Sequence, residues 1–262
     1  MEHNHNDLNE ENTSEGITIK KDYTLPISIL IAGVLIAGSL VYSAGKKSVV
    51  RDNQNVLDDV PRAVGAIQIK PISADDHVIG NPDALVKIIE FSDLECPFCK
   101  QFHATMKKVV QTYGDKVVWV YRHYPIPSLH SKAVKEAEAS ECAAELGGNQ
   151  GFWSYLDALF AVTPSNNGLD PAELPRFAEK IGLNRTAFMS CLESGKYASR
   201  IAEQTKDAEA SCTDQRECGT PRSIIIAPNG KLIAVPGAFP FENPSNPEFS
   251  MKKIIDGALL QK

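Results

Sequence analysis

The 262-residue chain is predicted to form an α/β domain with a helical insertion, preceded by one transmembrane helix. Short runs rich in β-branched residues alternate with longer amphipathic segments, in the order strand, helix, strand, long helical block, hairpin and helix. An uncharged apolar run near the N-terminus predicts the membrane helix. The length allows one substantial core but is short for two large domains, so we expect a single folded domain.

The N-terminal quarter of the chain is expected to lie outside that domain. Residues 1–24 are polar and acidic without periodicity, which indicates a disordered tail. Residues 25–45 carry no charge and as a helix would span a bilayer core of roughly 30 Å. A cleaved signal peptide is the alternative, but its apolar region is usually about 7–15 residues long. Residues 46–75 are a predicted linker that ends in an edge strand at 64–69, and the domain is assigned to 76–262.

The first half of the domain predicts a strand, a helix and a second strand. Residues 85–91 form a β-branched run typical of a strand buried on both faces, and they lead directly to Cys96. A helix is expected to begin at Pro97, because proline is favoured at the first helical position, and to end at Gly114. Residues 117–121 are the second predicted strand.

The second half predicts a helical block and a hairpin. Residues 128–210 have helical patterns and form the expected insertion; one helix opens at Asp170, a capping residue followed by proline. Residues 223–227 and 231–235 flank a Pro-Asn-Gly turn, which is a strong hairpin signal. An amphipathic helix is expected at 247–260.

The sequence Cys96-Pro97-Phe98-Cys99 lies where the first strand meets its helix. The unpaired amides and positive dipole end of a helix N-terminus favour a thiolate, the form that attacks a disulfide. A cysteine three residues further lies within reach to resolve the mixed disulfide. Zinc sites use the same spacing, but the strand, proline and helix together favour a redox pair.

Two longer motifs extend this pattern: residues 88–99, IIEFSDLECPFC, and Gly219-Thr220-Pro221 directly before the hairpin. Together they resemble the DsbA family of thioredoxin-fold proteins. The resemblance extends from about His77 to the C-terminus and implies a thioredoxin fold with an inserted helical domain. It also implies that Cys96 attacks, that Cys99 is the buried resolving cysteine, and that Pro221 is a cis-proline whose loop holds the substrate.

Four residues beside the cysteines are therefore expected to bind substrate: Pro97, Phe98, Thr220 and Pro221. A trans-proline that opens a strand is the alternative for Pro221, because X–Pro bonds are trans by default.

Glu90 lies six residues before Cys96, inside the apolar run, where an acid is costly unless it has a task. The resemblance places a proton-handling acid here, and a carboxylate could accept the Cys99 proton through water. A solvent-facing Glu at the sheet margin is the alternative. Glu95, next to the nucleophile, is expected to be solvated, to oppose thiolate formation mildly and to have no catalytic role.

Four further cysteines allow several pairings. Related proteins carry a disulfide between helices of the insertion, which implies Cys142–Cys191; two buried free thiols are the alternative. Cys212 and Cys218 depart from the family pattern and would close a short loop before Thr220 by a local disulfide. They could instead be a second exchangeable pair, or join the two active-site cysteines in a zinc site.

The resemblance implies disulfide transfer to reduced secreted or membrane proteins, followed by recycling through a quinone-linked membrane partner of DsbB or VKOR type. Six cysteines fit an extracytoplasmic domain with a cytoplasmic N-terminus. The net charge of −6 is mixed along the chain and indicates no nucleic-acid partner. We expect no cofactor, and no metal because the six histidines are scattered.

Two alternative functions stay open. One is a reductase or isomerase, because a threonine directly before the cis-proline, as at Thr220, resembles the isomerase relatives of the family. The other is a non-catalytic peptide-binding module.

Overall fold

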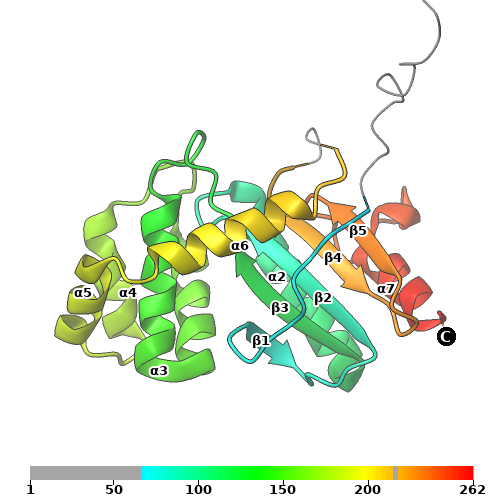
Figure 1. Cartoon of the computed structure of the whole chain (residues 1–262), viewed down its shortest axis with the longest axis horizontal. Coiled ribbons are helices and arrows are strands. Elements are labelled where there is room, and N and C mark those ends of the chain that lie inside the picture. The colour runs from blue at the N-terminus through cyan, green and yellow to red at the C-terminus, as the bar shows by residue number, and fades with distance from the viewer. Residues whose placement is uncertain (1–65, 215–217, 262) are drawn as a thin grey trace, which may run out of the picture. The chain divides into compact units, whose positions relative to one another are not determined.

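A five-stranded mixed sheet lies at the centre of the part of the chain that the computed structural model describes, residues 66–214 and 218–261 (Figure 1). The predicted tail and transmembrane helix, 1–24 and 25–45, lie outside these residues. Within the described residues, none of the helices has the length and apolar character needed to span a bilayer.

The strand order is β1-β3-β2-β4-β5, with β2 at the centre. β2 runs parallel to β3, and the other neighbouring pairs are antiparallel. Since a parallel pair needs a crossover, helix α2 connects β2 to β3. The strands are β1 His77–Gly80, β2 Val86–Ser92, β3 Val117–His123, β4 Arg222–Ile226 and β5 Leu232–Pro236.

Helices cover both faces of the sheet, because β2 and β3 have apolar side chains on each side. Ile88 and Trp119 pack with α2 and α7, whereas Ile89 and Val120 face α6. Figure 1 shows the insertion beyond the β1–β3 side of the sheet and α6 returning across it. The helices are α2 Pro97–Tyr113, α3 Ala133–Val162, α4 Leu174–Lys180, α5 Arg185–Ser194, α6 Ala198–Ala210 and α7 Met251–Leu259, with short 3-10 turns at Gly114–Lys116, Pro171–Glu173 and Pro247–Phe249.

The insertion follows the sequence prediction of a helical block. Its longest element, α3, consists of two helical stretches that are separated at Gly148, where the backbone angles are not helical. Gly148 has φ 64° and ψ −162°, a conformation that residues with a Cβ rarely adopt. Asp170 caps the next turn as predicted, since its side chain accepts a hydrogen bond from the Ala172 amide.

The edge strand predicted at 64–69 is wrong, because the edges of the sheet are β1 and β5 and residues 66–70 form no strand. Ile67 and Ile69 instead pack against the apolar cluster on the α6 face of the sheet. The Lys70 amide donates to Asp207 on α6 at 2.6 Å. The described end of the predicted linker, residues 66–75, is therefore attached to the domain by packing and hydrogen bonds.

Candidate active site

Cys96 and Cys99 lie at the junction of β2 with α2, both as free thiols. Cys96 is the N-cap residue of α2, with extended backbone angles, and Pro97 occupies the first helical position. Proline suits this position because the amide it lacks would have had no partner in the helix. Cys96 is 4% exposed and Cys99 is fully buried.

The two thiols have opposite tendencies to ionise. A hydrogen bond from the Cys99 thiol lowers the pKa of Cys96 to about 6, with Thr220 and the amides of Phe98 and Cys99 contributing. Burial and the neighbouring Cys96 sulfur raise the pKa of Cys99 well above its ordinary value. At neutral pH the reduced pair therefore holds its thiolate on Cys96 and its proton on Cys99.

The loop before β4 meets this pair from a distant part of the sequence. The Thr220–Pro221 peptide bond is cis, and the Cys96 Sγ lies 3.4 Å from the Thr220 carbonyl oxygen. Pro97 and Phe98 are exposed on the other side of Cys96, and 60% of the Phe98 surface is accessible. Of the residues expected to contact substrate, Pro97 and Phe98 are thus exposed directly after Cys96 and Thr220 contacts its sulfur, whereas Pro221 is buried.

Glu90 is buried beneath the pair, with 1% of its surface exposed, so it does not face solvent at a sheet margin. Its Oε2 accepts a hydrogen bond from the Trp119 indole at 2.8 Å. Burial raises the pKa of Glu90 to about 7, although Ser92 and Trp119 oppose the shift, and its charge acts on Cys99. A carboxyl group with this pKa can both accept and release a proton at neutral pH.

Glu95 is not solvated, which corrects the sequence prediction: its exposed fraction is 0%. The loop after α3 folds over it, so that the Asn166 amide donates to the Glu95 carbonyl oxygen at 2.8 Å. The Asn167 amide donates to its carboxylate. The local sequence contained no sign that the insertion would cover this residue.

Asp93 and His130 were not predicted from the sequence as residues of the site. The Asp93 amide lies 3.4 Å from the Cys99 sulfur, and its Oδ2 is 2.9 Å from the His130 Nδ1. Burial opposes a charge on His130, but the hydrogen bond and negative charge of Asp93 outweigh it and raise the pKa of His130. Asp93 follows β2 and His130 follows β3, so the shared edge of two parallel strands was a usable signal for their proximity.

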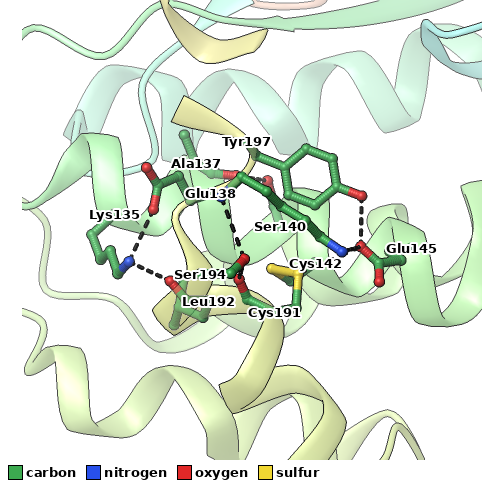
Figure 2. Close-up of a disulfide and its surroundings, with 11 residues drawn as sticks. Lys135, Ala137, Glu138, Ser140, Cys142, Glu145, Cys191, Leu192, Ser194 and Tyr197 are labelled. Carbon is green, nitrogen blue, oxygen red and sulfur yellow. Dashed lines mark hydrogen bonds and ion pairs between the residues drawn. A yellow bond between two sulfur atoms is a disulfide. The ribbon is translucent and has the colours of Figure 1, made fainter. Parts of the chain in front are cut away.

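The other four cysteines form two disulfides. Cys142–Cys191 joins α3 to α5 across 49 residues, and Cys212–Cys218 closes a loop of six. In Figure 2, Glu145 near the first disulfide accepts a hydrogen bond from Tyr197 at 2.8 Å.

In the described ranges no cluster of three or more His, Cys, Asp or Glu residues is arranged to hold a metal ion. Because Cys212 and Cys218 are bonded to each other, the structure does not contain the four-cysteine zinc site.

A family model described as Thioredoxin matches residues 73–232, more than half of the chain. The chain therefore belongs to this thioredoxin family, and its fold is similar to that of DsbA proteins. DsbA2 from Pseudomonas aeruginosa is 27% identical, with a TM-score of 0.58 over 73% of this chain and 100% of that chain. BdbD from Bacillus subtilis, at 22% identity, has a TM-score of 0.57 over 74% and 98%.

Curated relatives match a shorter part of the chain. The Na(+)/H(+) antiporter NhaA 3 of Salinispora tropica is 36% identical over 156 residues, which are 59% of this chain and 22% of the antiporter. NhaA 1 of Mycolicibacterium gilvum is 33% identical over 153 residues, 57% of this chain and 24% of that protein. The chain thus spans less than a quarter of the length of these relatives.

Proposed function

We propose that this protein introduces disulfides into reduced proteins outside the cytoplasm, using Cys96 and Cys99 as its redox pair. The observation that carries the proposal is the lowered pKa of Cys96 next to a buried thiol with a raised pKa. A stabilised thiolate lowers the free energy of the reduced enzyme. The Cys96–Cys99 disulfide is then a good acceptor of electrons.

The proposed exchange begins with the oxidised pair. A substrate thiolate attacks the Cys96 sulfur, the Cys96–Cys99 bond breaks, and Cys99 leaves with the electron pair. Glu90, protonated, supplies a proton to Cys99, directly or through water. A second substrate thiolate then attacks the substrate sulfur of the mixed disulfide and releases Cys96 as a thiolate. Two electrons pass from two substrate thiols to the enzyme, and the substrate gains one disulfide.

Substrate contact is assigned to the surface around Cys96. Exposed Pro97 and Phe98 offer apolar area to an unfolded chain, and the loop of Thr220 and Pro221 lies against the sulfur. A substrate segment between these two surfaces would have its cysteine beside Cys96. Such contacts do not require one particular substrate sequence, which suits a catalyst that acts on many reduced proteins.

The anchor and the partner are further parts of the proposal. Residues 25–45 would hold the protein in the membrane with a cytoplasmic N-terminus, and two structural disulfides suit an oxidising compartment. Reoxidation would come from a quinone-linked membrane partner of DsbB or VKOR type, which accepts the two electrons.

Incubating the oxidised full chain with a reduced unfolded protein tests the direction of transfer. We expect substrate thiols to disappear as the enzyme becomes reduced. Cys99→Ser, first converted by oxidised glutathione to the Cys96–glutathione mixed disulfide, should release glutathione thiol and accumulate a mixed disulfide between Cys96 and the substrate. If substrate thiols persist while a disulfide-containing substrate is reduced instead, the oxidase proposal fails.

Cell fractionation tests the proposed membrane anchor. Cells would express the full chain with and without residues 25–45, and loss of this segment is expected to release the protein from the membrane.

A reductase or isomerase is the second candidate, and the hydrogen bond between the Thr220 side chain and the Cys96 sulfur, which lowers the pKa of Cys96, favours it. A hydroxyl that stabilises the thiolate also suits attack by reduced Cys96 on a wrongly paired disulfide. This candidate predicts that the pair is reduced in the cell. Alkylation of the full chain immediately after cell lysis, followed by mass spectrometry, distinguishes the two resting states.

A further inference from the structure

Two carboxyl groups are buried together behind the nucleophile and take no part in the exchange described above. Glu95 precedes Cys96, and Glu136 lies in the first turn of α3; both are 0% exposed. Their side chains lie within hydrogen-bonding reach of each other. As two carboxylates, Glu95 Oε1 and both oxygens of Glu136 would have no hydrogen-bond partner among the described residues. Two such charges would repel each other in a site without water to solvate them.

A turn with left-handed backbone angles packs against Glu95. Ser165, Asn166 and Asn167 have φ values of 63°, 52° and 65°, which is uncommon for residues other than glycine. Such backbone conformations persist when surrounding contacts enforce them, and they occur often at functional sites. Here they direct the amides of Asn166 and Asn167 onto the carbonyl and carboxylate of Glu95.

Two lysines hold this loop from opposite sides. Lys100, on α2 directly after Cys99, donates to the Thr163 carbonyl oxygen at 2.6 Å. Lys132, before α3, donates to the Asn167 carbonyl oxygen at 2.7 Å. The insertion is therefore attached to the segment that carries the nucleophile at several points, and two of these contacts, from the amides of Asn166 and Asn167, are made to Glu95 itself.

We propose that Glu95 and Glu136 share one proton as an acid–carboxylate pair, and that this hydrogen bond positions the backbone of Cys96 against the insertion. One proton lets one carboxyl group donate and the other accept, and it halves the buried charge. Both are positioning residues that act through Cys96. The inference deepens the proposed function and rests on it, because it assigns the helical insertion a task in exchange.

The surrounding charges keep the proton in place at neutral pH. Asp93, from the connection after β2, opposes a second negative charge, whereas Lys132, before α3, favours it. Cys96 at the start of α2, His130 after β3 and Tyr155 in the second half of α3 are further titratable groups near the site. Burial and Glu95 raise the pKa of Glu136 to about 10, so the shared proton is lost only at alkaline pH.

Two matched variants of the full chain test this pair. Glu136→Gln keeps a hydrogen-bond donor for Glu95 but has no proton to lose, whereas Glu136→Leu has no donor. Infrared spectra as a function of pH detect a protonated buried carboxyl group, and exchange with a small neutral disulfide reports on Cys96. Spectra of Glu90→Gln identify any band that belongs to Glu90, so that it can be subtracted.

We expect a protonated carboxyl band in the wild type that persists at neutral pH, disappears near the pKa of Glu136 and is absent from Glu136→Gln. Glu136→Gln should exchange about tenfold faster than Glu136→Leu, since a hydrogen bond to a charged group is lost only in the latter. The wild-type exchange rate should fall severalfold at alkaline pH relative to Glu136→Gln. If Glu136→Leu does not fold, the infrared spectra and pH profiles of the wild type and Glu136→Gln still test whether the two carboxyl groups share a proton.

Absence of the band, or identical pH profiles for the wild type and Glu136→Gln, would overturn the shared proton. Cys96→Ser separates this inference from the proposed function, because it should lose exchange and keep the band. If the wild type shows the band but no exchange that depends on Cys96, the proposed function fails and the pair remains. If exchange depends on Cys96 and the band is missing, only the pair fails.

Discussion

The active-site pair Cys96 and Cys99 and the insertion pair Cys142 and Cys191 belong to the same apolar core, yet their surroundings differ. Cys96 precedes a helix and faces free backbone amides and the Thr220 loop. Cys142 and Cys191 lie inside α3 and α5, where helical hydrogen bonds occupy the amides. Burial is therefore shared by both pairs, and the supply of hydrogen bonds to a thiolate distinguishes the reactive pair from the structural one.

The largest effect is expected when the active-site pair is broken. Cys96→Ser should reduce disulfide exchange by at least about a thousandfold, because a serine hydroxyl does not ionise at neutral pH and cannot form the mixed disulfide. The matched control replaces Cys142 and Cys191 by serine and should retain Cys96-dependent exchange while folded. Thiol release from a small disulfide measures both. Equal loss in the two variants would show that the comparison between the pairs is mistaken.

Loss of the insertion disulfide should instead appear in stability. Replacing Cys142 and Cys191 by alanine is expected to lower the free energy of unfolding by about 4 kcal/mol, because the bond closes a loop of 49 residues in the unfolded chain. Denaturant unfolding of the oxidised wild type and the double variant measures the difference. A difference near zero would mean that this disulfide is not the structural member of the comparison.

Glu90 is a second feature that distinguishes the active-site pair from the insertion pair, because its buried carboxyl group acts on Cys99. Its pKa in the folded protein is about 7, raised from 4.5, so its contribution to stability is present below pH 4.5 and is lost as pH rises to about 7. The loss amounts to about 3 kcal/mol. Glu90→Gln should remove this pH dependence and slow exchange at neutral pH by about tenfold to a hundredfold, since Cys99 loses its proton donor.

Unfolding measured at several pH values and exchange rates at neutral pH test the two parts of that prediction. Glu90→Asp serves as a control that keeps an acid but shortens it. If Glu90→Gln has the same pH dependence of stability as the wild type, the pKa of Glu90 is not raised by folding, and its assigned role in proton transfer is wrong.

The smallest effect is expected for the loop disulfide. Replacing Cys212 and Cys218 by serine should lower the free energy of unfolding by about 2 kcal/mol, since a loop of six residues loses less entropy on closure. Exchange of Cys96 with a small disulfide should change by less than about threefold. Stopped-flow thiol release measures this rate. A much larger fall would favour the alternative in which Cys212 and Cys218 relay electrons to the active site.

Local signals in the sequence predicted most of the fold and the centre of the site. The β-branched run of β2, Pro97 at the start of α2 and the turn before β5 each specify their element within a few residues. Cys96 could be placed at a helix N-terminus for the same reason, because strand, proline and helix are neighbours in sequence.

Features that depend on distant packing could not be predicted in this way. The isoleucines at 67 and 69 resemble a strand, but they cover the α6 face, while the four-residue β1 pairs with β3. Glu95 has the sequence context of a surface turn and is buried only because the insertion folds over it. The transmembrane helix at 25–45 remains a prediction from hydropathy and length.

The reduction potential of Cys96–Cys99 tests the central claim most directly. The full chain would be equilibrated with glutathione at defined ratios, and the redox state of the pair would be read by alkylation and mass spectrometry. A stabilised Cys96 thiolate predicts a potential near the oxidising end of the thioredoxin-fold range, about −120 mV. A potential near about −270 mV, as in thioredoxin, would contradict the account and assign the protein to disulfide reduction.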